Sequence, residues 1–186
     1  MTTEEILFDM EERMEKAVTV YRDELRGLRT GRATPALLDS LRVEYYGSLT
    51  AIKQLAQVST PDPQQLVVRP FDAGALKDIE KAIRASNLGL APNNDGKIIR
   101  LQVPTMSGEQ RQKMVAHIKK RAEETKVSCR NIRRDANKHL ESAEKAGDLT
   151  EDELAKGKER VQNLLKTYED KIQDLADKKA KEVMEQ

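Results

Sequence analysis

Three stretches of the chain place apolar residues three or four positions apart, which is the spacing of a helical face that packs against other helices. The first stretch has Leu7, Met10, Met14, Ala17, Tyr21, Leu25 and Leu28. The second has Met114, Ile118, Ala122, Thr125, Cys129, Ile132, Ala136, Leu140 and Ala143, and the third has Leu154, Val161, Leu165, Tyr168, Ile172, Leu175 and Val183. Three helices can bury these faces against one another, so we expect an antiparallel three-helix bundle. At 1.5 Å per residue a helix of roughly 35–40 residues is ~50–60 Å long, which makes the bundle elongated.

Two of these helices carry sequence signals for their first turn. Ser107 is followed three positions later by Gln110, and Thr150 by Glu153. Both are capping boxes, in which the hydroxyl and the longer side chain satisfy backbone N–H groups that the first turn leaves free. The second helix should therefore begin near Ser107 and end near Gly147, and the third should begin near Thr150.

The prolines separate the middle of the chain from its flanks. All six lie between Gly31 and Pro104, and proline inside a helix costs ~3 kcal/mol. Charge changes at the same points, because residues 31–104 hold 16 of the 65 charged residues. We therefore expect residues 1–30 and 105–186 to form the bundle and residues 31–104 to form an inserted domain.

The inserted segment has the pattern of a small mixed α/β module. Residues 42–46, 66–69 and 97–103 are short runs rich in β-branched or alternating apolar residues, which indicates strands. Residues 76–83 place apolar side chains on one side of a short helix, and residues 93–96 suit a turn. The fold class expected for the whole chain is α+β.

The two connections between bundle and module each contain a residue that interrupts a helix. Gly31 lies in the first connection, and Pro104 lies next to Thr105 in the second. Two such connections side by side predict a hinge, with Gly31, Pro104 and Thr105 as its candidate residues. The alternative is rigid docking of the module on the bundle, which requires a large apolar interface.

The composition argues against several classes of protein. No apolar run approaches the ~18 residues of a membrane span, and the acidic N-terminus does not resemble a secretory signal. Cys129 is the single cysteine and falls on the apolar face of the second helix, so we expect a buried, unreactive thiol and a reducing, cytoplasmic location. His117 and His139 are too far apart on one helix to bind a metal together, and no glycine-rich phosphate loop occurs. We expect no catalytic residues, no metal and no cofactor.

Charge is distributed unevenly although the net charge is only +1. Between Arg111 and Lys138 the second helix has ten Lys or Arg and three Asp or Glu. At 100° per residue, part of this charge forms a stripe beside the apolar face, interrupted by Glu123. The stripe consists of Lys119, Lys126, Arg130, Arg133 and Arg134. One guanidinium group can donate two parallel hydrogen bonds to the oxygens of one phosphate. The stripe is therefore a candidate site for a nucleic-acid backbone.

A solvated charged surface is the alternative reading of this stripe, and the sequence leaves the two readings open. Arg22, Arg26 and Arg29 repeat the pattern on the first helix, and Arg32 follows them. No aromatic residue lies among these arginines, so reading of bases by stacking is not expected. Recognition would then depend on shape and backbone, as it does for folded RNA.

Several longer motifs resemble the bacterial-type ribosome recycling factor family. They are RTGRATP at positions 29–35, VEYYG at 43–47, SNLGLAPN at 86–93 and VSCRNIRRDAN at 127–137. The resemblance extends over essentially the whole chain, in order and with matching spacing. Two departures are visible: Cys129 stands where the family usually has an aliphatic residue, and VPTMSGEQRQ at 103–112 replaces an entry with more Pro, Leu and Arg.

The resemblance implies an L-shaped protein in which a small β/α/β domain joins a three-helix bundle through a two-strand hinge. It implies a monomer that binds the large subunit of the post-termination ribosome. Together with elongation factor G, which hydrolyses GTP, it would split the subunits and release mRNA and tRNA. The family's arginines correspond to Arg29, Arg32, Arg130, Arg133 and Arg134, which would contact ribosomal RNA. Lys119 and Lys126 are further candidates that only the stripe supports.

A different class of function also fits the helical pattern. The apolar faces could pair with a partner helix, as in a coiled-coil adaptor or assembly protein. That reading predicts oligomers whose size depends on concentration and no preference for RNA.

Overall fold

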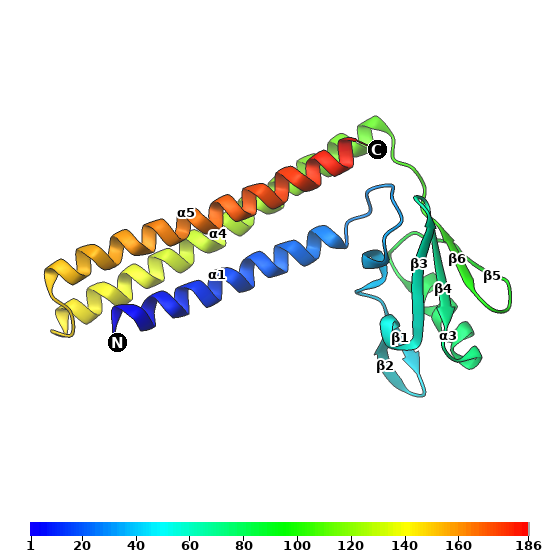
Figure 1. Cartoon of the computed structure of the whole chain (residues 1–186), viewed down its shortest axis with the longest axis horizontal. Helices are drawn as coiled ribbons and strands as arrows, with labels where there is room; N and C mark the ends of the chain where they lie inside the picture. Colours follow the sequence, from blue (N-terminus) through cyan, green and yellow to red (C-terminus); the bar gives the residue numbers. More distant parts are fainter. Residues whose placement is uncertain (186) are drawn as a thin grey trace. The chain divides into compact units, whose positions relative to one another are not determined.

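The computed structural model describes residues 1–185, which divide into two compact units. The first unit contains Met1–Leu25 and Lys113–Glu182, and the second contains Arg26–Gln112 together with the end of the chain from Val183. Three long helices make up the first unit, and the described strands all belong to the second (Figure 1). The expected α+β class, with a module inserted between helices, is confirmed.

The first unit is an antiparallel three-helix bundle. Helices α1 (Thr3–Arg26), α4 (Gly108–Lys145) and α5 (Glu151–Met184) run side by side (Figure 1). Ion pairs on the surface follow the same arrangement: Arg13 to Asp135 at 2.8 Å joins α1 to α4. Arg160 to Glu4 at 2.6 Å joins α5 to α1. Exposed pairs of this kind each contribute little, so the stability of the bundle comes from its apolar interior.

The predicted apolar faces form that interior. Met14, Ile118, Leu140, Val161 and Ile172 are fully buried. Within the three helices, four members of the patterns are only half-buried: Met114 and Leu154, which begin the second and third patterns, and Ala17 and Leu175. Leu28, the last member of the first pattern, lies beyond the end of α1. In α1, the buried residues Ile6 and Val18 lie outside the predicted pattern, and they widen the apolar face that α1 presents to its two neighbours.

Both predicted capping boxes are present. The Ser107 hydroxyl accepts from the N–H of Gln110 at 3.2 Å, and the Gln110 side chain accepts from the N–H of Ser107 at 2.9 Å. Thr150 and Glu153 make the equivalent pair of bonds, at 3.2 and 2.7 Å. Each box satisfies two backbone donors that the first helical turn leaves free, so the starts of α4 and α5 are defined by local sequence.

The second unit contains two antiparallel sheets and two α-helices. Its first sheet is the hairpin of β1 (Arg42–Tyr45) and β2 (Ser48–Ala51). The second has the order β3 (Ala56–Asp62), β4 (Gln65–Pro70), β6 (Ile99–Gln102) and β5 (Pro92–Asn94). The helices are α2 (Ile52–Leu55) and α3 (Leu76–Ala85), with short 3-10 turns η1 (Pro35–Leu38) and η2 (Ala73–Ala75).

A separate apolar core holds the second unit together. Leu38, Leu66, Ile79, Ile99 and Leu101 are buried completely in it. These residues come from a 3-10 turn, from two neighbouring strands and from α3, so the core connects helix and sheet. The unit does not depend on the bundle for its interior.

The strands of the second unit were only partly predictable. The expected strands near residues 42–46, 66–69 and 97–103 and the expected helix at 76–83 are confirmed. The prediction did not include β2, β3 and β5. Strand β3 lies at one edge of its sheet and contains Pro61 and mostly exposed residues, while β5 is three residues long and begins with Pro92. Edge strands need neither alternating apolar residues nor every backbone donor, so their sequence signal is weak.

A tight contact between α4 and α5 gives a first prediction. At Gly157 of α5 an added Cβ atom would lie 3.1 and 3.2 Å from the two methyl carbons of Leu140 in α4. Gly157→Leu therefore overfills the contact and should lower the free energy of unfolding by about 1–3 kcal/mol. Denaturant titration followed by far-UV circular dichroism measures this loss. Ala155→Leu adds the same side chain at an exposed position of the same helix and should change stability little; equal losses in both variants would contradict the prediction.

The single cysteine gives a second prediction. Cys129 is fully buried, and burial, with a smaller contribution from the charge of Glu169, raises the pKa of its thiol to about 11. A thiol reagent acts on the thiolate, so at mildly alkaline pH the native protein should react at least about a hundredfold more slowly than the unfolded chain. Labelling with a chromogenic disulfide reagent, with and without denaturant, measures the ratio. Equal rates would show that the thiol is accessible and reactive.

Candidate nucleic-acid interface

Three residues of the predicted basic stripe, Lys126, Arg130 and Arg133, contact α5. Lys126 Nζ donates to Gln173 Oε1 at 2.6 Å, and Arg130 Nε donates to Glu169 Oε1 at 2.8 Å. Because the two helices are antiparallel, residue numbers that increase along α4 are paired with residue numbers that decrease along α5. This part of the stripe therefore forms a ridge at the boundary of the two helices, where α5 supplies the hydrogen-bond partners.

Arg130 is held between two carboxylates. Its Nη1 atom lies 2.9 Å from Glu123 of α4, and its Nε atom lies 2.8 Å from Glu169 of α5. The hydrogen bond to Glu123, and to a smaller extent the one to Glu169, raises the pKa of the Arg130 guanidinium. Its positive charge is thus balanced locally, and a phosphate would have to compete with two carboxylates for it.

Arg133 and Arg134 have no carboxylate partner among residues 1–185. Arg133 Nη1 donates to Gln162 Oε1 and Arg134 Nη1 to Asn131 Oδ1, both over a long 3.4 Å. Amide oxygens carry no net charge, so both guanidinium groups keep their full positive charge. They are the arginines of the stripe that are available to an anion.

Two buried polar atoms near this ridge lack a protein partner. Arg133 Nε and Asn137 Oδ1 are both buried and make no hydrogen bond within the described chain. The two residues are four positions apart and therefore lie on the same side of α4. Asn137 is the last residue of the VSCRNIRRDAN motif, and its spacing in the sequence does not predict a role for it.

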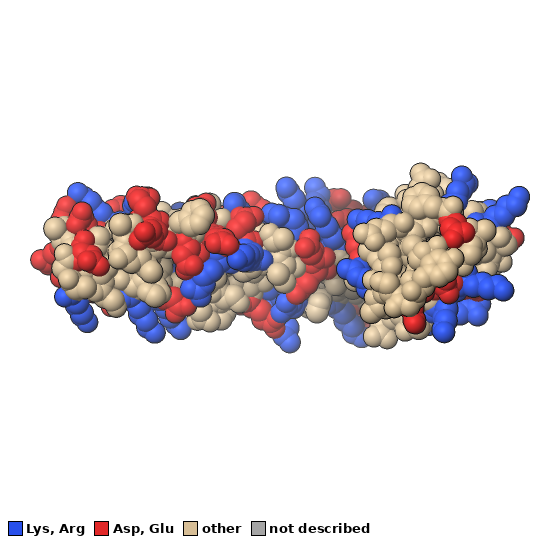
Figure 2. All heavy atoms as spheres, turned by 90° about the horizontal axis from the view of Figure 1, so that it is seen from below, with Lys and Arg blue, Asp and Glu red and all other residues tan. Residues whose placement is uncertain are grey.

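The lysines of the stripe differ from each other. Lys119 is exposed, and no partner is recorded for it within residues 1–185, whereas Lys126 is half-buried and bonded to Gln173. Basic and acidic side chains are also interspersed along the face of the bundle that Figure 2 shows. The stripe is therefore a local excess of positive charge centred on Arg133 and Arg134.

The other two predicted arginines belong to the second unit. Arg29 and Arg32 are exposed and follow the end of α1. Arg29 Nη1 donates to the carbonyl oxygen of Leu88 at 3.0 Å, within the same unit. The structure brings five of the seven candidates together on α4 and places these two on a separate unit.

The candidate hinge residues differ in their surroundings. Gly31 is buried and has a φ of +86°, which residues other than glycine rarely adopt. On the second connection, Val103 is buried and its N–H donates to Gln64 O at 2.7 Å, whereas Pro104 and Thr105 are exposed. Val103, one residue past the end of β6, is thus still hydrogen-bonded to the second unit.

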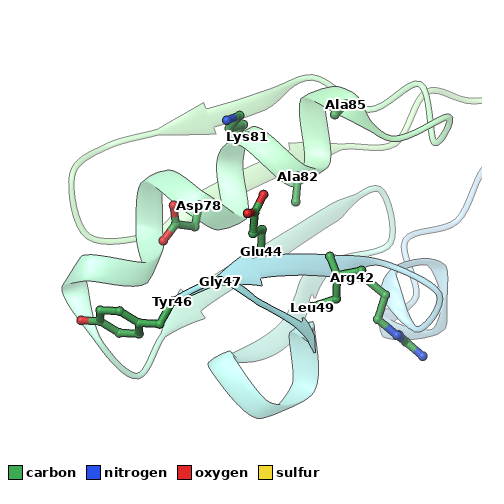
Figure 3. Close-up of a pocket in the computed structure, with 9 residues that line it drawn as sticks. All are labelled: Arg42, Glu44, Tyr46, Gly47, Leu49, Asp78, Lys81, Ala82 and Ala85. Carbon is green, nitrogen blue, oxygen red and sulfur yellow. The ribbon is translucent and has the colours of Figure 1, made fainter.

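The second unit also has a surface groove of ≈ 480 Å³ between the β1–β2 hairpin and α3 (Figure 3). Its charged residues balance, because Arg42 and Lys81 are matched by Glu44 and Asp78. At the hairpin turn, Tyr46 is 87% exposed and has a φ of +49°. A groove of balanced charge gives no general attraction for a phosphate backbone, so it does not extend the basic stripe.

The described chain contains no arrangement suited to catalysis by a metal. No group of three or more His, Cys, Asp or Glu within residues 1–185 could hold a metal ion. His117 and His139 are both exposed on α4. In the same residues, no helix is both long and apolar enough to cross a membrane.

Comparison with known proteins gives one consistent result. A sequence profile described as ribosome recycling factor matches residues 21–184. The ribosome-recycling factor of Rhodopirellula baltica is 64% identical over 138 residues, which are 74% of each chain. That of Symbiobacterium thermophilum is 49% identical over 183 residues, covering 98% of this chain and 99% of its own.

Solved structures agree with the sequence comparison. A solution structure of a ribosome recycling factor has a TM-score of 0.82 at 40% identity and covers 99% of this chain and 98% of its own. A second structure has a TM-score of 0.69 at 42% identity, with 98% and 99% coverage. It belongs to models for the T. thermophilus ribosome recycling factor and the E. coli elongation factor G bound to the E. coli post-termination complex. The profile match, the relatives and the helical bundle with its inserted module together establish that this chain belongs to the ribosome recycling factor family.

Proposed function

We propose that this protein binds the post-termination ribosome and, together with elongation factor G, separates the ribosomal subunits so that mRNA and tRNA are released. The observation that carries the proposal is similarity over nearly the full chain to ribosome recycling factors. One of these relatives belongs to models with elongation factor G bound to a post-termination complex. GTP would be bound and hydrolysed by elongation factor G.

The basic stripe of α4 is the proposed contact with ribosomal RNA of the large subunit. Arg133 and Arg134 would make the main contacts because their partners are amide oxygens and no carboxylate of residues 1–185 pairs with them. Arg130, which Glu123 and Glu169 hold, would contribute less. Lys119 and Lys126 would add positive charge along the same ridge, and Arg29 and Arg32 would bind phosphates from the second unit. Release of counterions from RNA makes such binding strongly dependent on salt.

The proposed mechanism is mechanical. The bundle, anchored on RNA, would stay fixed while elongation factor G pushes the second unit about a hinge at Gly31, Pro104 and Thr105. Each unit has its own apolar interior, which supports movement of one without unfolding of the other. The protein would act as a lever without chemistry of its own and as a monomer.

The adaptor reading loses its main support in this fold. That reading needs apolar helical faces that are open to a partner helix. The faces of α1, α4 and α5 are buried against one another, with Met14, Ile118 and Val161 fully enclosed. Sedimentation of the protein alone and with large ribosomal subunits separates the two readings, because an adaptor would form oligomers by itself and would ignore the subunits.

Removal of one available arginine tests the RNA contact. Arg133→Ala should weaken binding to large ribosomal subunits by about 1–3 kcal/mol, the range for a hydrogen bond to a charged group. It should also reduce the slope of log affinity against log salt by about one, because one phosphate contact is lost. Filter binding or sedimentation over a series of salt concentrations measures both values.

The matched control is Arg160→Ala. It removes the same charge from the bundle, but Arg160 is paired with Glu4 and lies outside the stripe. Its binding should stay close to that of the parent protein, and both variants should keep their helical circular dichroism. Unchanged binding of a folded Arg133→Ala protein would refute the assignment of this arginine.

Subunit separation tests the proposed activity as a whole. Light scattered by post-termination ribosomes should fall when the protein, elongation factor G and GTP are all present. It should stay constant when the protein is omitted or when a GTP analogue that resists hydrolysis replaces GTP. A constant signal in the complete mixture would contradict the proposal, provided that a known ribosome recycling factor gives a decrease under the same conditions.

A further inference from the structure

The side chain of Arg29 is fastened to a turn that lies far away in sequence. Its Nη1 atom donates to the carbonyl oxygen of Leu88 at 3.0 Å. The turn itself is anchored, because Leu90 is buried in the core of the second unit beside Leu37. Arg29, Leu88, Leu90 and Leu37 also line one shallow hollow of ≈ 250 Å³. The Arg29 guanidinium thus contacts a turn of its own unit that is connected directly to the buried Leu90.

Gly89 leaves the space that this contact requires. A Cβ atom added at Gly89 would lie 2.8 Å from Arg29 Nη1 and 3.9 Å from its Cζ atom. The first distance is shorter than a carbon atom can approach, so one of the two groups would have to move. The end of an arginine side chain moves more easily than an anchored turn, and Arg29 would therefore be displaced while the fold persists.

The contact orients the Arg29 side chain and leaves most of its N–H donors available to a ligand. A guanidinium has five N–H donors, and the Leu88 carbonyl occupies one of them. The residue is exposed, and no carboxylate partner is recorded for it within residues 1–185. A long side chain that is already held in place loses less conformational entropy when it binds.

We propose that the Leu88–Gly89 turn is a positioning element for Arg29, in which the Leu88 carbonyl holds the guanidinium and the absence of a side chain at Gly89 admits it. The inference rests on the proposed contact between Arg29 and ribosomal RNA. It adds two positioning residues to that contact, and neither of them touches RNA itself.

Variants at Gly89 test the role of the open space. Gly89→Ala should weaken binding to large ribosomal subunits about two- to tenfold, the range for loss of one preorganised long side chain. Gly89 has a φ of +65°, so alanine also introduces backbone strain. Gly89→Asn provides the second variant, because asparagine tolerates this region of φ while its Cβ meets the same Arg29 atom.

Gly47→Ala is the matched control for strain. Gly47 lies in the same unit with a φ of +76°, and apart from its own chain neighbours no atom of residues 1–185 lies within 4 Å of a Cβ added there. Its variant should lose stability as Gly89→Ala does and should bind the subunit like the parent protein. A loss of binding in Gly47→Ala equal to that in Gly89→Ala would assign the effect to strain and overturn the proposal.

A double-mutant cycle with Arg29→Ala decides whether Gly89 acts through Arg29. Arg29→Ala alone should weaken binding, and adding Gly89→Ala to it should cause no further loss. An NMR signal from the Arg29 side-chain N–H should also shift in Gly89→Ala and stay unchanged in Gly47→Ala. Additive losses of binding, or an Arg29 signal that does not respond to Gly89→Ala, would overturn the positioning role.

The same measurements separate this inference from the proposed function. If Arg29→Ala binds normally while Arg133→Ala does not, the role of Arg29 and its positioning by Gly89 are both refuted, and the stripe remains the anchor. If both arginine variants bind normally, the proposed RNA contact itself is refuted. If Arg29→Ala weakens binding and neither Gly89 variant does, only the positioning role is refuted.

Discussion

The arrangement of charge in this protein depends on the packing of three apolar helical faces. Once Met14, Ile118 and Val161 are buried together, the rotation of each helix about its axis is set. That rotation directs one side of α4 towards α5, so Arg130 pairs with the Glu169 carboxylate while Arg133 donates to the Gln162 amide oxygen. The interior of the bundle therefore decides which arginines carry an unbalanced charge.

This coupling explains how a protein with a net charge of +1 can have a site for an anion. The adjacent arginines Arg133 and Arg134 donate to side-chain amide oxygens instead of carboxylates. Their field is local and falls off within about a Debye length, which is ~8 Å at physiological ionic strength. Such a site contributes affinity at contact and gives little long-range attraction for RNA in general.

In the second unit, Arg29 is held by a different kind of contact. In the bundle, neighbouring helices determine the surroundings of each side chain, whereas Arg29 is held by a single backbone carbonyl beside a glycine. Both arrangements use groups without net charge, the amides of Gln162 and Asn131 and the carbonyl of Leu88. A neutral acceptor orients a guanidinium and leaves its charge for a ligand, which a carboxylate would not do.

The sequence by itself determined the three helices, the starts of two of them and the main strands of the inserted module. These features depend on spacing along the chain and on local caps, such as that of Ser107 and Gln110, which act between residues close in sequence. It also located the basic stripe, because positions on one helix follow from 3.6 residues per turn. The edge strands β3 and β5 could not be predicted, since an edge strand needs no apolar alternation.

Only the tertiary structure decided how the stripe is divided. Arg130 and Arg133 are three positions apart and look equivalent in sequence, yet one meets Glu169 and the other Gln162 on a helix about thirty to forty residues further along. The contact of Arg29 with the turn at Gly89 joins residues from separate segments in the same way. Partners that are distant in the chain are brought together by burial of apolar surface, and that burial says nothing in advance about which polar side chains will face each other.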